Sequence, residues 1–519
     1  MQLHKIALAD THSFSSFFLD YISQKDSLKK FYHRFPSLNN FRDQIAEKKT
    51  FSANHRQVLF NSLSAQYEGL KISEAVSSNL WSLKDAKTFT VTTGHQLCIF
   101  TGPLYFIYKI VTVINACKRL KEEYPDCCFV PVYWMASEDH DYEEIKSFRL
   151  YGKKYTWETS QSGAVGRFDP KSISKLIDEL PGDVSVFKTA YAKSKTLAQA
   201  TRHFVNELFG SYGLVVVDGD DRELKSLFTN VMEEDLFKHL PKQLVEEKNK
   251  ALEAIGYHPQ VFARDINFFY LDNGIRQRIE KVGDDFKVID TELKFSTSEI
   301  KGLIEKSPER FSPNVILRPL YQEVILPNLA YAGGPAEVVY WLQLVGVFDH
   351  FKVPFPILMP RNFGGVIDAP TKRKFEKTGV DLVDLFLEKN ILFNHWTQKN
   401  AHDNLSLKKE IDAVKTLFDD IRKRASQADA TLLKHADAQA SRSIKSVEVI
   451  EKKMLRAEKR KHADKLSQLE AVKNFLFPNG SPQERTDNFL NFHQQDPTFI
   501  QKLIQNFDPF DFRFTIFEL

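Results

Sequence analysis

Cysteine is scarce in this chain of 519 residues, which contains only four. All four fall in the first third of the sequence, and no two of them have the C-x-x-C spacing of a zinc or redox motif. The adjacent pair would point to opposite faces of a strand, so these two thiols are poorly placed to share a metal ion. We therefore expect reduced thiols and no zinc site at Cys98, Cys117, Cys127 and Cys128.

Long apolar runs and an imbalance of charge are also missing. No stretch approaches the ~20 apolar residues of a transmembrane helix, and the opening Met-Gln-Leu-His-Lys-Ile lacks the apolar core of a signal peptide. With 71 Lys and Arg against 68 Asp and Glu, the net charge is only +3. Bulk charge therefore gives no basis for binding nucleic acid or an anionic membrane. We expect a cytoplasmic protein with small-molecule ligands and without a membrane or nucleic-acid partner.

The most informative stretch is 88–109. A β-branched run at 88–93 predicts a buried strand, and Gly102-Pro103 precedes a helical apolar pattern at 104–120. A glycine-containing loop between a strand and a helix presents backbone N–H groups at the positive end of the helix dipole, which suits a phosphate or carboxylate. The spacing matches neither the dinucleotide fingerprint nor a P-loop. It predicts a small-acid or nucleotide site that includes Thr93, Gly94, Gln96, Thr101, Gly102 and Tyr105.

A strand followed by a polar or glycine-rich loop recurs downstream. Apolar runs at 128–136, 213–218 and 355–359 predict further strands, and another unit is expected from Asn314 through the 333–337 loop to a helix ending at Trp341. These parts predict an α/β protein with a Rossmann-like, doubly wound core interrupted by insertions. In such sheets, ligands bind at the carboxyl ends of the strands.

An acidic cluster with one histidine follows the strand at 128–136 directly. Three interpretations are open. The cluster can cap a helix, it can hold Mg²⁺ together with nucleotide phosphates, or it can bind substrate and supply a general base, with His140 oriented by a neighbouring carboxylate. We favour the last, which makes Asp139, His140 and Asp141 catalytic candidates and Glu138 a substrate-binding candidate.

A second polar cluster combines an arginine with two adjacent glycines. Arginine can bind a carboxylate through two parallel hydrogen bonds, and the glycines let the backbone approach a ligand closely. A turn with a surface ion pair would explain the same residues equally well. The substrate-binding candidates are Arg318, Gln322, Tyr331, Gly333, Gly334 and Glu337.

Composition predicts how the chain is divided. Asn273-Gly274 indicates a β-hairpin. From 405 to 475 the chain has no proline or glycine, and apolar residues recur every three or four positions, which favours an antiparallel helical hairpin with a bend near 424–442 over an ordinary pair of surface helices.

The expected parts are a helical cap without strands (1–80), the first part of the core (81–150), an insertion (151–210), a core strand (211–220), an insertion with the hairpin (221–311), the second part of the core (312–368), coiled-coil helices (369–475) and a tail packed on the core (476–519).

Four blocks, spread from the first core strand to the tail, carry a resemblance to a known family. They are Thr-Gly-His-Gln…Phe-Thr-Gly-Pro-Leu-Tyr at 93–105, Trp-Met-Ala-Ser-Glu-Asp-His-Asp at 134–141, Asn-Leu-Ala-Tyr-Ala-Gly-Gly-Pro-Ala-Glu at 328–337 and Phe-Pro-Asn-Gly-Ser-Pro-Gln-Glu-Arg at 477–485. Together they resemble the cysteine-adding enzyme family of bacillithiol biosynthesis. One departure is His95, which stands where a glutamine is expected. The resemblance implies a core laid out like class I aminoacyl-tRNA synthetases, connecting insertions, and a long coiled coil that forms a homodimer.

The resemblance also implies the chemistry, which is the joining of cysteine to glucosaminyl-malate. Amide formation needs an activated carboxylate, so ATP or ADP is expected to bind, with Mg²⁺ possible and the activated species left open. The 93–103 loop would hold phosphate or carboxylate, the 138–141 cluster would take the amine proton, and Arg318 with the 333–337 loop would orient the acidic substrate. The expected cofactor-binding residues are Asn479, Gly480, Gln483 and Arg485.

Two alternatives remain at this point. One is a non-catalytic nucleotide-binding scaffold that signals through its coiled coil. The other is a nucleotidyltransferase that acts on another small acid. The chain lacks the Lys-Met-Ser-Lys-Ser loop of the synthetases, which weakens a simple adenylation mechanism.

Overall fold

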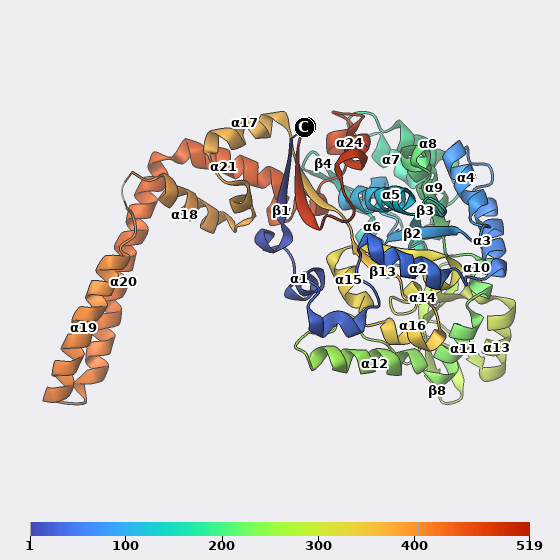
Figure 1. Ribbon diagram of the computed structural model, residues 1–519, viewed down its shortest axis with the longest axis horizontal. Coiled ribbons are helices and arrows are strands. Elements are labelled where there is room, and N and C mark those ends of the chain that lie inside the picture. The colour runs from blue at the N-terminus through green and yellow to red at the C-terminus, as the bar shows by residue number, and fades with distance from the viewer. Residues whose placement is uncertain (1, 403) are drawn as a thin grey trace.

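The centre of the molecule is a parallel sheet of five strands in the order β13-β12-β2-β3-β6 (Figure 1). The computed structural model describes residues 2–402 and 404–519. From β2 the chain runs outward to β3 and β6, then returns to the other side of β2 for β12 and β13, so the predicted doubly wound, Rossmann-like core is confirmed. The strands are β2 (Thr88–His95), β3 (Cys128–Met135), β6 (Val215–Asp218), β12 (Asn328–Gly333) and β13 (Ile357–Pro360).

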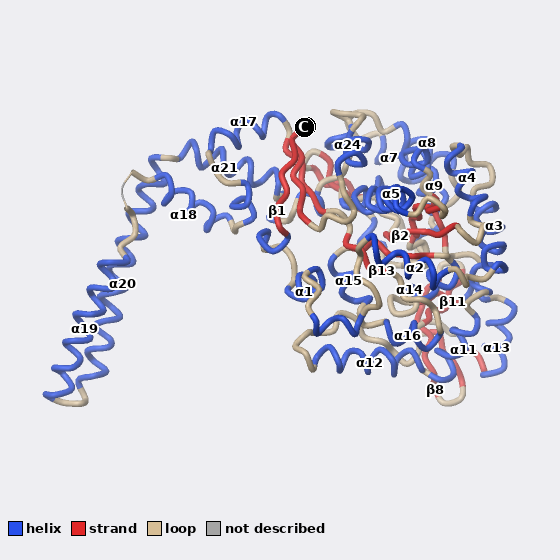
Figure 2. Tube along the Cα trace, viewed as in Figure 1, coloured by secondary structure: helices blue, strands red, loops and turns tan. Residues whose placement is uncertain are grey.

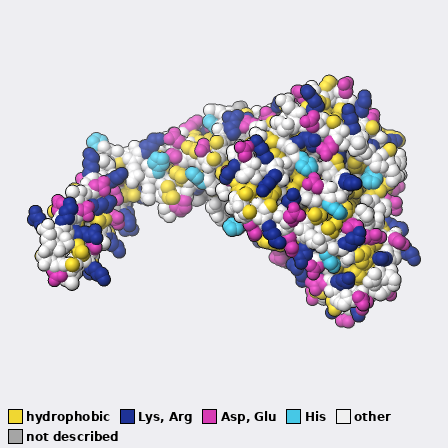
Figure 3. Space-filling view, turned by 60° about the horizontal axis from the view of Figure 1, so that its bottom comes forward, with side chains coloured by type: hydrophobic (Ala, Val, Ile, Leu, Met, Phe, Trp, Pro, Cys, Tyr) yellow, Lys and Arg dark blue, Asp and Glu magenta, His cyan; other side chains and the backbone are white. Residues whose placement is uncertain are grey.

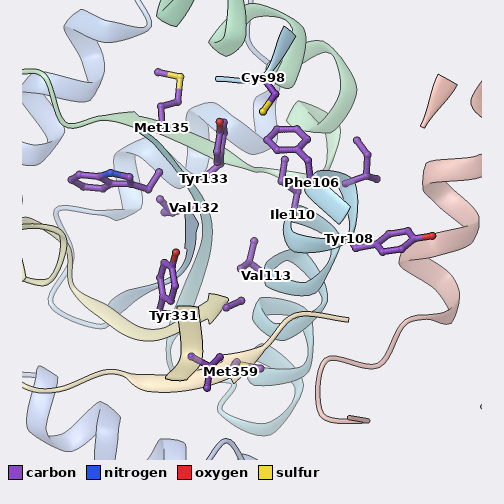
Figure 4. Close-up of a cluster of buried hydrophobic side chains, with 14 of the residues drawn as sticks. Cys98, Phe106, Tyr108, Ile110, Val113, Val132, Tyr133, Met135, Tyr331 and Met359 are labelled. Carbon is purple, nitrogen blue, oxygen red and sulfur yellow. The ribbon is translucent and has the colours of Figure 1, made fainter. Parts of the chain in front are cut away.

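Strand β2 is buried along its whole length, and the hydroxyls of Thr90, Thr92 and Thr93 are paired, whereas that of Thr88 has no partner among the described groups. Thr90 and Thr92 donate their hydroxyls to Asn328 Oδ1 on β12, at 3.0 and 2.8 Å. Buried polar groups are tolerated when they are hydrogen-bonded in this way. Helix α5 (Tyr105–Glu123) lies against β2 and β3, and its Phe106 and Ile110 belong to the apolar cluster in Figure 4. The strand, loop and helix predicted at 88–120 are therefore present.

The N-terminal segment contains a strand as well as helices, which corrects the expectation of a purely helical cap. Strand β1 (Gln2–Ala7) pairs antiparallel with β15 (Arg513–Glu518). Its partner lies at the opposite end of the chain, so no local pattern announces the pairing. The helices of this segment are α1 (Ser16–Ile22), α2 (Phe41–Lys48), α3 (Ala53–Gln66) and α4 (Glu74–Ser82).

Two long segments separate the core strands. The one between β3 and β6 contains α6 (Tyr142–Ile145), β4 (Ser147–Leu150), β5 (Lys153–Thr156), α7 (Ser174–Ile177), α8 (Ser185–Lys193) and α9 (Leu197–Phe209). The one between β6 and β12 contains α10 (Arg222–Ser226), α11 (Thr229–Lys238), α12 (Leu240–Glu253), α13 (Thr297–Lys306) and an antiparallel sheet in the order β10-β9-β8-β7-β11. Its strands are β7 (Phe268–Asp272), β8 (Ile275–Val282), β9 (Asp285–Val288), β10 (Lys294–Ser296) and β11 (Phe311–Pro313). Asn273-Gly274 joins β7 to β8, so the predicted hairpin is confirmed.

The chain returns to the central sheet later than expected. The apolar run from Asn314 was expected to open a core strand, but the structure forms α14 (Arg318–Ile325) there and the strand β12 begins only at Asn328. Pro319 in the first turn favours a helix start because its missing N–H costs nothing there. A short apolar run does not by itself distinguish a buried helix from a strand. Helices α15 (Pro335–Trp341) and α16 (Val345–Phe351) follow β12.

The C-terminal part combines a small sheet with a helical arm. Strand β14 (Phe363–Ile367) forms a sheet with β15 and β1 in the order β1-β15-β14. Helices α19 (Lys408–Ala428) and α20 (Leu432–Lys461) run antiparallel and extend away from the core (Figures 1 and 2), with their turn inside the predicted bend. The other helices are α17 (Ala369–Thr378), α18 (Lys389–Asn400), α21 (Ala463–Leu476), α22 (Gln483–Thr486), α23 (Leu490–His493) and α24 (Phe499–Asn506).

A buried ion pair fastens this C-terminal part to the core. Arg361, which directly follows β13, contacts Glu484 of α22 through two hydrogen bonds of 3.1 and 2.6 Å. Both side chains are only 4% exposed. Glu484 also accepts a hydrogen bond from the Gly364 backbone N–H at 2.9 Å. The carboxylate is therefore fully engaged, and its loss would leave a buried guanidinium without a counter-charge.

We expect Glu484→Ala to lower the free energy of unfolding by about 3–5 kcal/mol, because breaking a buried pair strands the remaining charge. Urea unfolding followed by tryptophan fluorescence measures the change. Arg119→Ala is the matched control, since Arg119 forms an exposed pair with Asp508 across the same two parts of the chain, and its loss should cost only about 0–1 kcal/mol. Equal effects of the two variants would contradict the prediction.

Candidate active site

A pocket of about 700 Å³ opens at the carboxyl ends of β2, β3 and β12. Strands β2 and β12 are neighbours where the strand order reverses, which is the place where open α/β sheets bind ligands. Gly94 on β2, Ala136 after β3 and Gly334 after β12 line the pocket. Three arginines reach it from elsewhere: Arg264 from the loop before β7, Arg276 from β8 and Arg485 from α22. The pocket is thus built by the core, an insertion and the C-terminal part together.

A buried lysine organises the floor of the pocket. Lys109 Nζ donates to Gly94 O at 2.7 Å and lies 2.5 Å from Glu337 Oε2. Glu337 also accepts hydrogen bonds from the Tyr331 hydroxyl at 2.6 Å and from the Gly334 N–H at 2.8 Å. Burial alone would raise the pKa of Glu337, but Lys109 and these hydrogen bonds outweigh it and lower the pKa to about 2. The carboxylate therefore stays charged and holds β12, α15 and α5 together.

Guanidinium groups gather near Lys109. Arg318 on α14 donates to Gln322 Oε1 at 3.1 Å, and its guanidinium carbon lies 5.6 Å from the centre of the Tyr331 ring. Arg361, oriented by its ion pair, has an Nε with no partner among the described groups. Arg485 is exposed at the rim. This wall of the pocket suits a ligand that carries carboxylates or phosphates.

Carboxylates line the part of the pocket that follows β3. Asp139 Oδ2 accepts a hydrogen bond from Gln96 Nε2 at 3.0 Å. Burial would raise the pKa of Asp139, but this bond and the Arg276 guanidinium outweigh it and lower the pKa. Glu138 behaves in the opposite way: burial raises its pKa even though its carboxylate contacts the Lys225 ammonium. Two adjacent carboxyl groups therefore differ in their tendency to hold a proton.

The two histidines of the site are both poor proton acceptors. Burial, and then the nearby Lys109 charge, lower the pKa of His95 to about 3, so its imidazole is neutral. His140 lies in a shallower neighbouring pocket that shares Gln96 and Asp139 with the first. Burial and the Arg276 guanidinium lower the pKa of His140 as well. The departure at His95 thus places a neutral ring, not a charged one, in the pocket lining.

A buried polar network lies behind the carboxylate wall. Ser137 donates its hydroxyl to Asp218 Oδ1, and Arg167 holds Asp220 through hydrogen bonds of 2.7 and 2.8 Å. Lys225 lies 3.9 Å from Asp220 in addition to its contact with Glu138. The carboxylates at and just after the end of β6, Asp218 and Asp220, therefore bind groups of the protein itself, among them Ser137 in the loop after β3.

The structure brings many of the predicted site residues into these two pockets. Gly94, Gln96, Tyr105, Glu138, Asp139, Arg318, Tyr331, Gly334, Glu337 and Arg485 line the larger one, and His140 and Asp141 line the shallower one. Asp141 also accepts a hydrogen bond from Glu144 N as the cap of α6, so the capping interpretation is confirmed for a loop that also lines both pockets.

Other predicted residues serve the fold and do not line either pocket. Thr93 donates its hydroxyl to Ala332 O at 2.7 Å, and Gln322 is buried between Arg318 and Glu323. Gly333 is also outside the pocket lining. Asn479 and Gly480 are exposed away from both pockets, and Gln483 bonds both the N–H and the carbonyl of Val366.

The loop that contains Thr101 and Gly102 is occupied by the protein itself. Asn488 Nδ2 donates to the carbonyls of Phe100 and Gly102, both at 2.7 Å, and the Leu104 N–H donates to Asp487 O. The Phe100 N–H donates to the Tyr191 hydroxyl. The backbone N–H groups of Phe100 and Leu104, which an anion would need, are therefore bound to Tyr191 of α8 and to the C-terminal segment. Thr101 and Gly102 do not line the pocket.

Several lining residues were not predicted. Lys109 was not among the predicted site residues, and the structure shows it buried in an ion pair. Arg361 lies two residues after the predicted strand at 355–359, so its position after a core strand was a usable signal. Arg276 follows the Asn273-Gly274 turn on a strand remote from the core, and nothing in the local pattern distinguishes it.

The described part of the chain offers neither a metal-ligand cluster nor a membrane-spanning helix. In residues 2–402 and 404–519, no group of three or more His, Cys, Asp or Glu side chains could hold a metal ion. In the same residues, no helix is long and apolar enough to cross a membrane. The thiols of Cys98, Cys117 and Cys127 are buried, and Cys128 is exposed.

These features define the class. A Rossmann-like core carries, at its switch point, a pocket with one cationic wall and one acidic wall, and a long helical arm follows the core. Such a pocket suits an enzyme that acts on a small polar substrate with groups of both charges.

Comparison with known proteins identifies the family. Residues 1–362 match "Bacillithiol biosynthesis BshC, N-terminal Rossmann-like domain" and residues 365–519 match "Bacillithiol biosynthesis BshC, C-terminal coiled-coil domain". The chain therefore belongs to the BshC family of cysteine ligases of bacillithiol biosynthesis. Relatives named "Putative cysteine ligase BshC" include those of Cytophaga hutchinsonii (42% identical, 98% of each chain covered), Flavobacterium psychrophilum (40%, 97% of each) and Salinibacter ruber (30%, 96% of this chain and 95% of the relative).

The ion pair on the pocket floor makes a prediction about acid stability. Because the folded-state pKa of Glu337 lies at about 2, below its ordinary value of 4.5, its stabilising contribution is present above about pH 4.5 and is lost as the pH falls toward 2. We expect Glu337→Gln to remove at most about 3 kcal/mol of the pH-dependent stability in that window. Urea unfolding at several pH values measures it. Glu143→Gln, at an exposed ion pair, is the control, and an acid profile unchanged by Glu337→Gln would contradict the prediction.

Proposed function

We propose that this enzyme forms an amide bond between the carboxyl group of cysteine and the amine of glucosaminyl-malate, after a nucleotide has activated the cysteine carboxyl. The observation that carries the proposal is the division of one pocket into a cationic and an acidic wall. Glucosaminyl-malate has carboxylates at one end and an amine at the other, so its charges match this division. The family descriptions supply bacillithiol biosynthesis as the context.

The cationic wall is proposed to bind the malate carboxylates. Arg318 is oriented by Gln322 and by the Tyr331 ring, and Arg361 is oriented by Glu484. Guanidinium groups that are already fixed lose little entropy when they bind a carboxylate. Arg485 lies at the rim, where it can reach the part of the ligand nearest to solvent.

The acidic wall is proposed to handle the amine. Asp139, whose pKa is lowered, stays ionised and is suited to attract an ammonium group. Glu138, whose pKa is raised by burial, is the better proton acceptor, because a general base works best when its pKa lies near the working pH. Asp141 shapes the loop as the cap of α6. Among the 138–141 residues, we therefore assign proton transfer to Glu138 and amine binding to Asp139.

The nucleotide is proposed to be ATP, with Mg²⁺ bound to its phosphates. Arg485 is the one predicted cofactor residue that lines the pocket, so it is the candidate for phosphate contact. Binding cysteine and its co-substrate side by side would supply much of the acceleration, because a bimolecular step becomes effectively unimolecular.

Mass spectrometry of reactions containing cysteine, glucosaminyl-malate and ATP-Mg²⁺ tests the proposal, with each component omitted in turn. A bacillithiol mass that requires ATP supports it, and release of AMP or ADP distinguishes an acyl-adenylate from an acyl-phosphate. Nucleotide binding without any product would favour the alternative of a scaffold that signals through its helical arm. Transfer of a nucleotidyl group to another small acid would favour the second alternative.

In the same assay, Arg318→Gln is expected to raise KM for glucosaminyl-malate about tenfold or more, because a charge-assisted hydrogen bond is worth about 1.5–3 kcal/mol. The value of kcat should change less, since the carboxylates are remote from the reacting amine. Arg222→Gln is the control, because Arg222 is exposed on α10 and lies outside the pocket. A KM unchanged by Arg318→Gln would remove Arg318 from the site.

The helical arm is proposed to form a homodimer. Several large apolar side chains are 40–58% exposed along its two helices, although charged side chains of both signs surround them (Figure 3). A second copy of the arm would cover these side chains, as a coiled-coil seam does. They are Leu417, Ile421, Leu432, Val449 and Ile450.

We expect Leu417→Glu combined with Ile421→Glu to convert a dimer into a monomer, because two charges would be buried in the seam. Analytical ultracentrifugation measures the mass. Ile391→Glu on α18, at a side chain that is 54% exposed, is the matched control and should leave the dimer intact. A monomeric wild-type protein would contradict the proposal.

A further inference from the structure

His140 lies in the loop between β3 and α6, with its side chain about half exposed. It lines the shallower pocket next to Gln96 and Asp139. From sequence it is a candidate general base, because an unperturbed imidazole titrates near neutral pH. The surrounding residues indicate a different role.

The decisive contact is with Arg276. Its Nη1 lies 2.6 Å from His140 Nδ1. Arginine has only hydrogen-bond donors and keeps its proton in proteins, so Nδ1 must supply a lone pair as the acceptor. A neutral imidazole carries one proton, and with Nδ1 accepting, that proton is on Nε2. The geometry therefore fixes both the charge and the tautomer of the ring.

Arg276 is itself held rigidly. Its Nε donates to Ser312 Oγ at 3.1 Å, and its guanidinium carbon lies 4.1 Å from the centre of the Phe269 ring. The residue is 8% exposed. A hydrogen bond on one side and a cation–π contact on the other restrict its movement away from His140.

The charges around His140 divide into two sets. Asp139 Oδ1 lies 3.7 Å from His140 Nδ1, and Asp141 follows in the same loop; both carboxylates favour the protonated ring. Burial and Arg276 oppose it, and they dominate, so the pKa of His140 is lowered. Asp139 Oδ1 is already engaged by the backbone N–H groups of His140 and Asp141. The Phe269 ring, 5.5 Å away, contributes no charge.

We propose that Arg276 is a positioning residue that keeps His140 neutral with its proton on Nε2, so that His140 donates a hydrogen bond to a substrate oxygen and does not remove a proton. The assignment of a substrate oxygen rests on the ligase function proposed above, whereas the state of the ring does not. Arg276 comes from the insertion between β6 and β12, so this insertion takes part in the site. The proton-accepting role then remains with Glu138.

Nitrogen NMR of protein labelled in the histidine rings tests the state of the ring. The signals of His140 are identified by their loss in His140→Gln. We expect an Nε2–H neutral ring at neutral pH and a protonation midpoint below the ordinary value of about 6.5. In Arg276→Met, the protonation midpoint of His140 should move to higher pH than in the wild-type protein, because burial alone then opposes the charged ring. Arg278→Met is the control, since Arg278 lies on the same strand, pairs with Glu280 and is 39% exposed.

Arg276→Lys provides a second variant in case Arg276→Met does not fold, because it keeps the charge and loses the planar fork. A wild-type His140 that titrates near its ordinary value, or that carries its proton on Nδ1, overturns the proposal. An Arg276 variant that leaves the titration unchanged overturns the role of Arg276. These readings need no ligase activity, so they stay informative if the proposed reaction fails.

Activity provides the second readout. The amide of glutamine can place a donor near the position of Nε2, so His140→Gln should lose less than about tenfold in kcat, whereas His140→Ala should lose about a hundredfold, the usual effect of removing one preorganised donor. If His140 were the base, both variants would be equally impaired, and the wild-type rate would fall below about pH 6.5. Equal impairment would overturn the donor role.

Discussion

The buried ammonium group of Lys109 is the interaction on which the site depends. It joins the end of β2, through Gly94 O, to Glu337 at the start of α15. Glu337 in turn binds Tyr331 on β12. The two strands at the switch point and the helices that follow them are thereby held in one arrangement. An ion pair is costly to bury, so it stabilises the site only if its charged groups also make hydrogen bonds. Here the Gly334 N–H donates a further hydrogen bond to the Glu337 carboxylate.

The C-terminal part of the chain completes this arrangement from outside the core. Glu484 orients Arg361, Arg485 lines the pocket, and Asn488 holds the loop before α5 through two carbonyls. The helices α19 and α20 extend away from the central sheet (Figure 1). A short segment after α21 therefore completes the pocket, whereas no residue of α19 or α20 lines it.

The pocket also shows how one loop can provide groups with different chemistry. Glu138 and Asp139 are adjacent, yet one is buried against Lys225 and the other accepts a hydrogen bond from Gln96. His140, the next residue, contacts Arg276 on β8 through its Nδ1 atom, which must accept the hydrogen bond. Burial and individual partners, and not residue type alone, decide which group stays charged and which can exchange a proton.

The sequence by itself determined the architecture and the location of the site. The buried strands at 88–93 and 128–136, the hairpin at Asn273-Gly274 and the helical arm were readable, because hydrophobic periodicity and turn residues act over a few positions. The strand β1 was not readable, since its partner is at the other end of the chain, and the helix α14 was mistaken for a strand because its apolar run is short. Of the predicted site residues, Arg318, Glu138 and Asp139 line the pocket, whereas Thr101 and Gly102 lie outside it. Only the tertiary structure decided the roles within the site, because the partners of Lys109, His140 and the 98–103 loop come from segments far away in sequence, and contacts of that kind leave no local pattern.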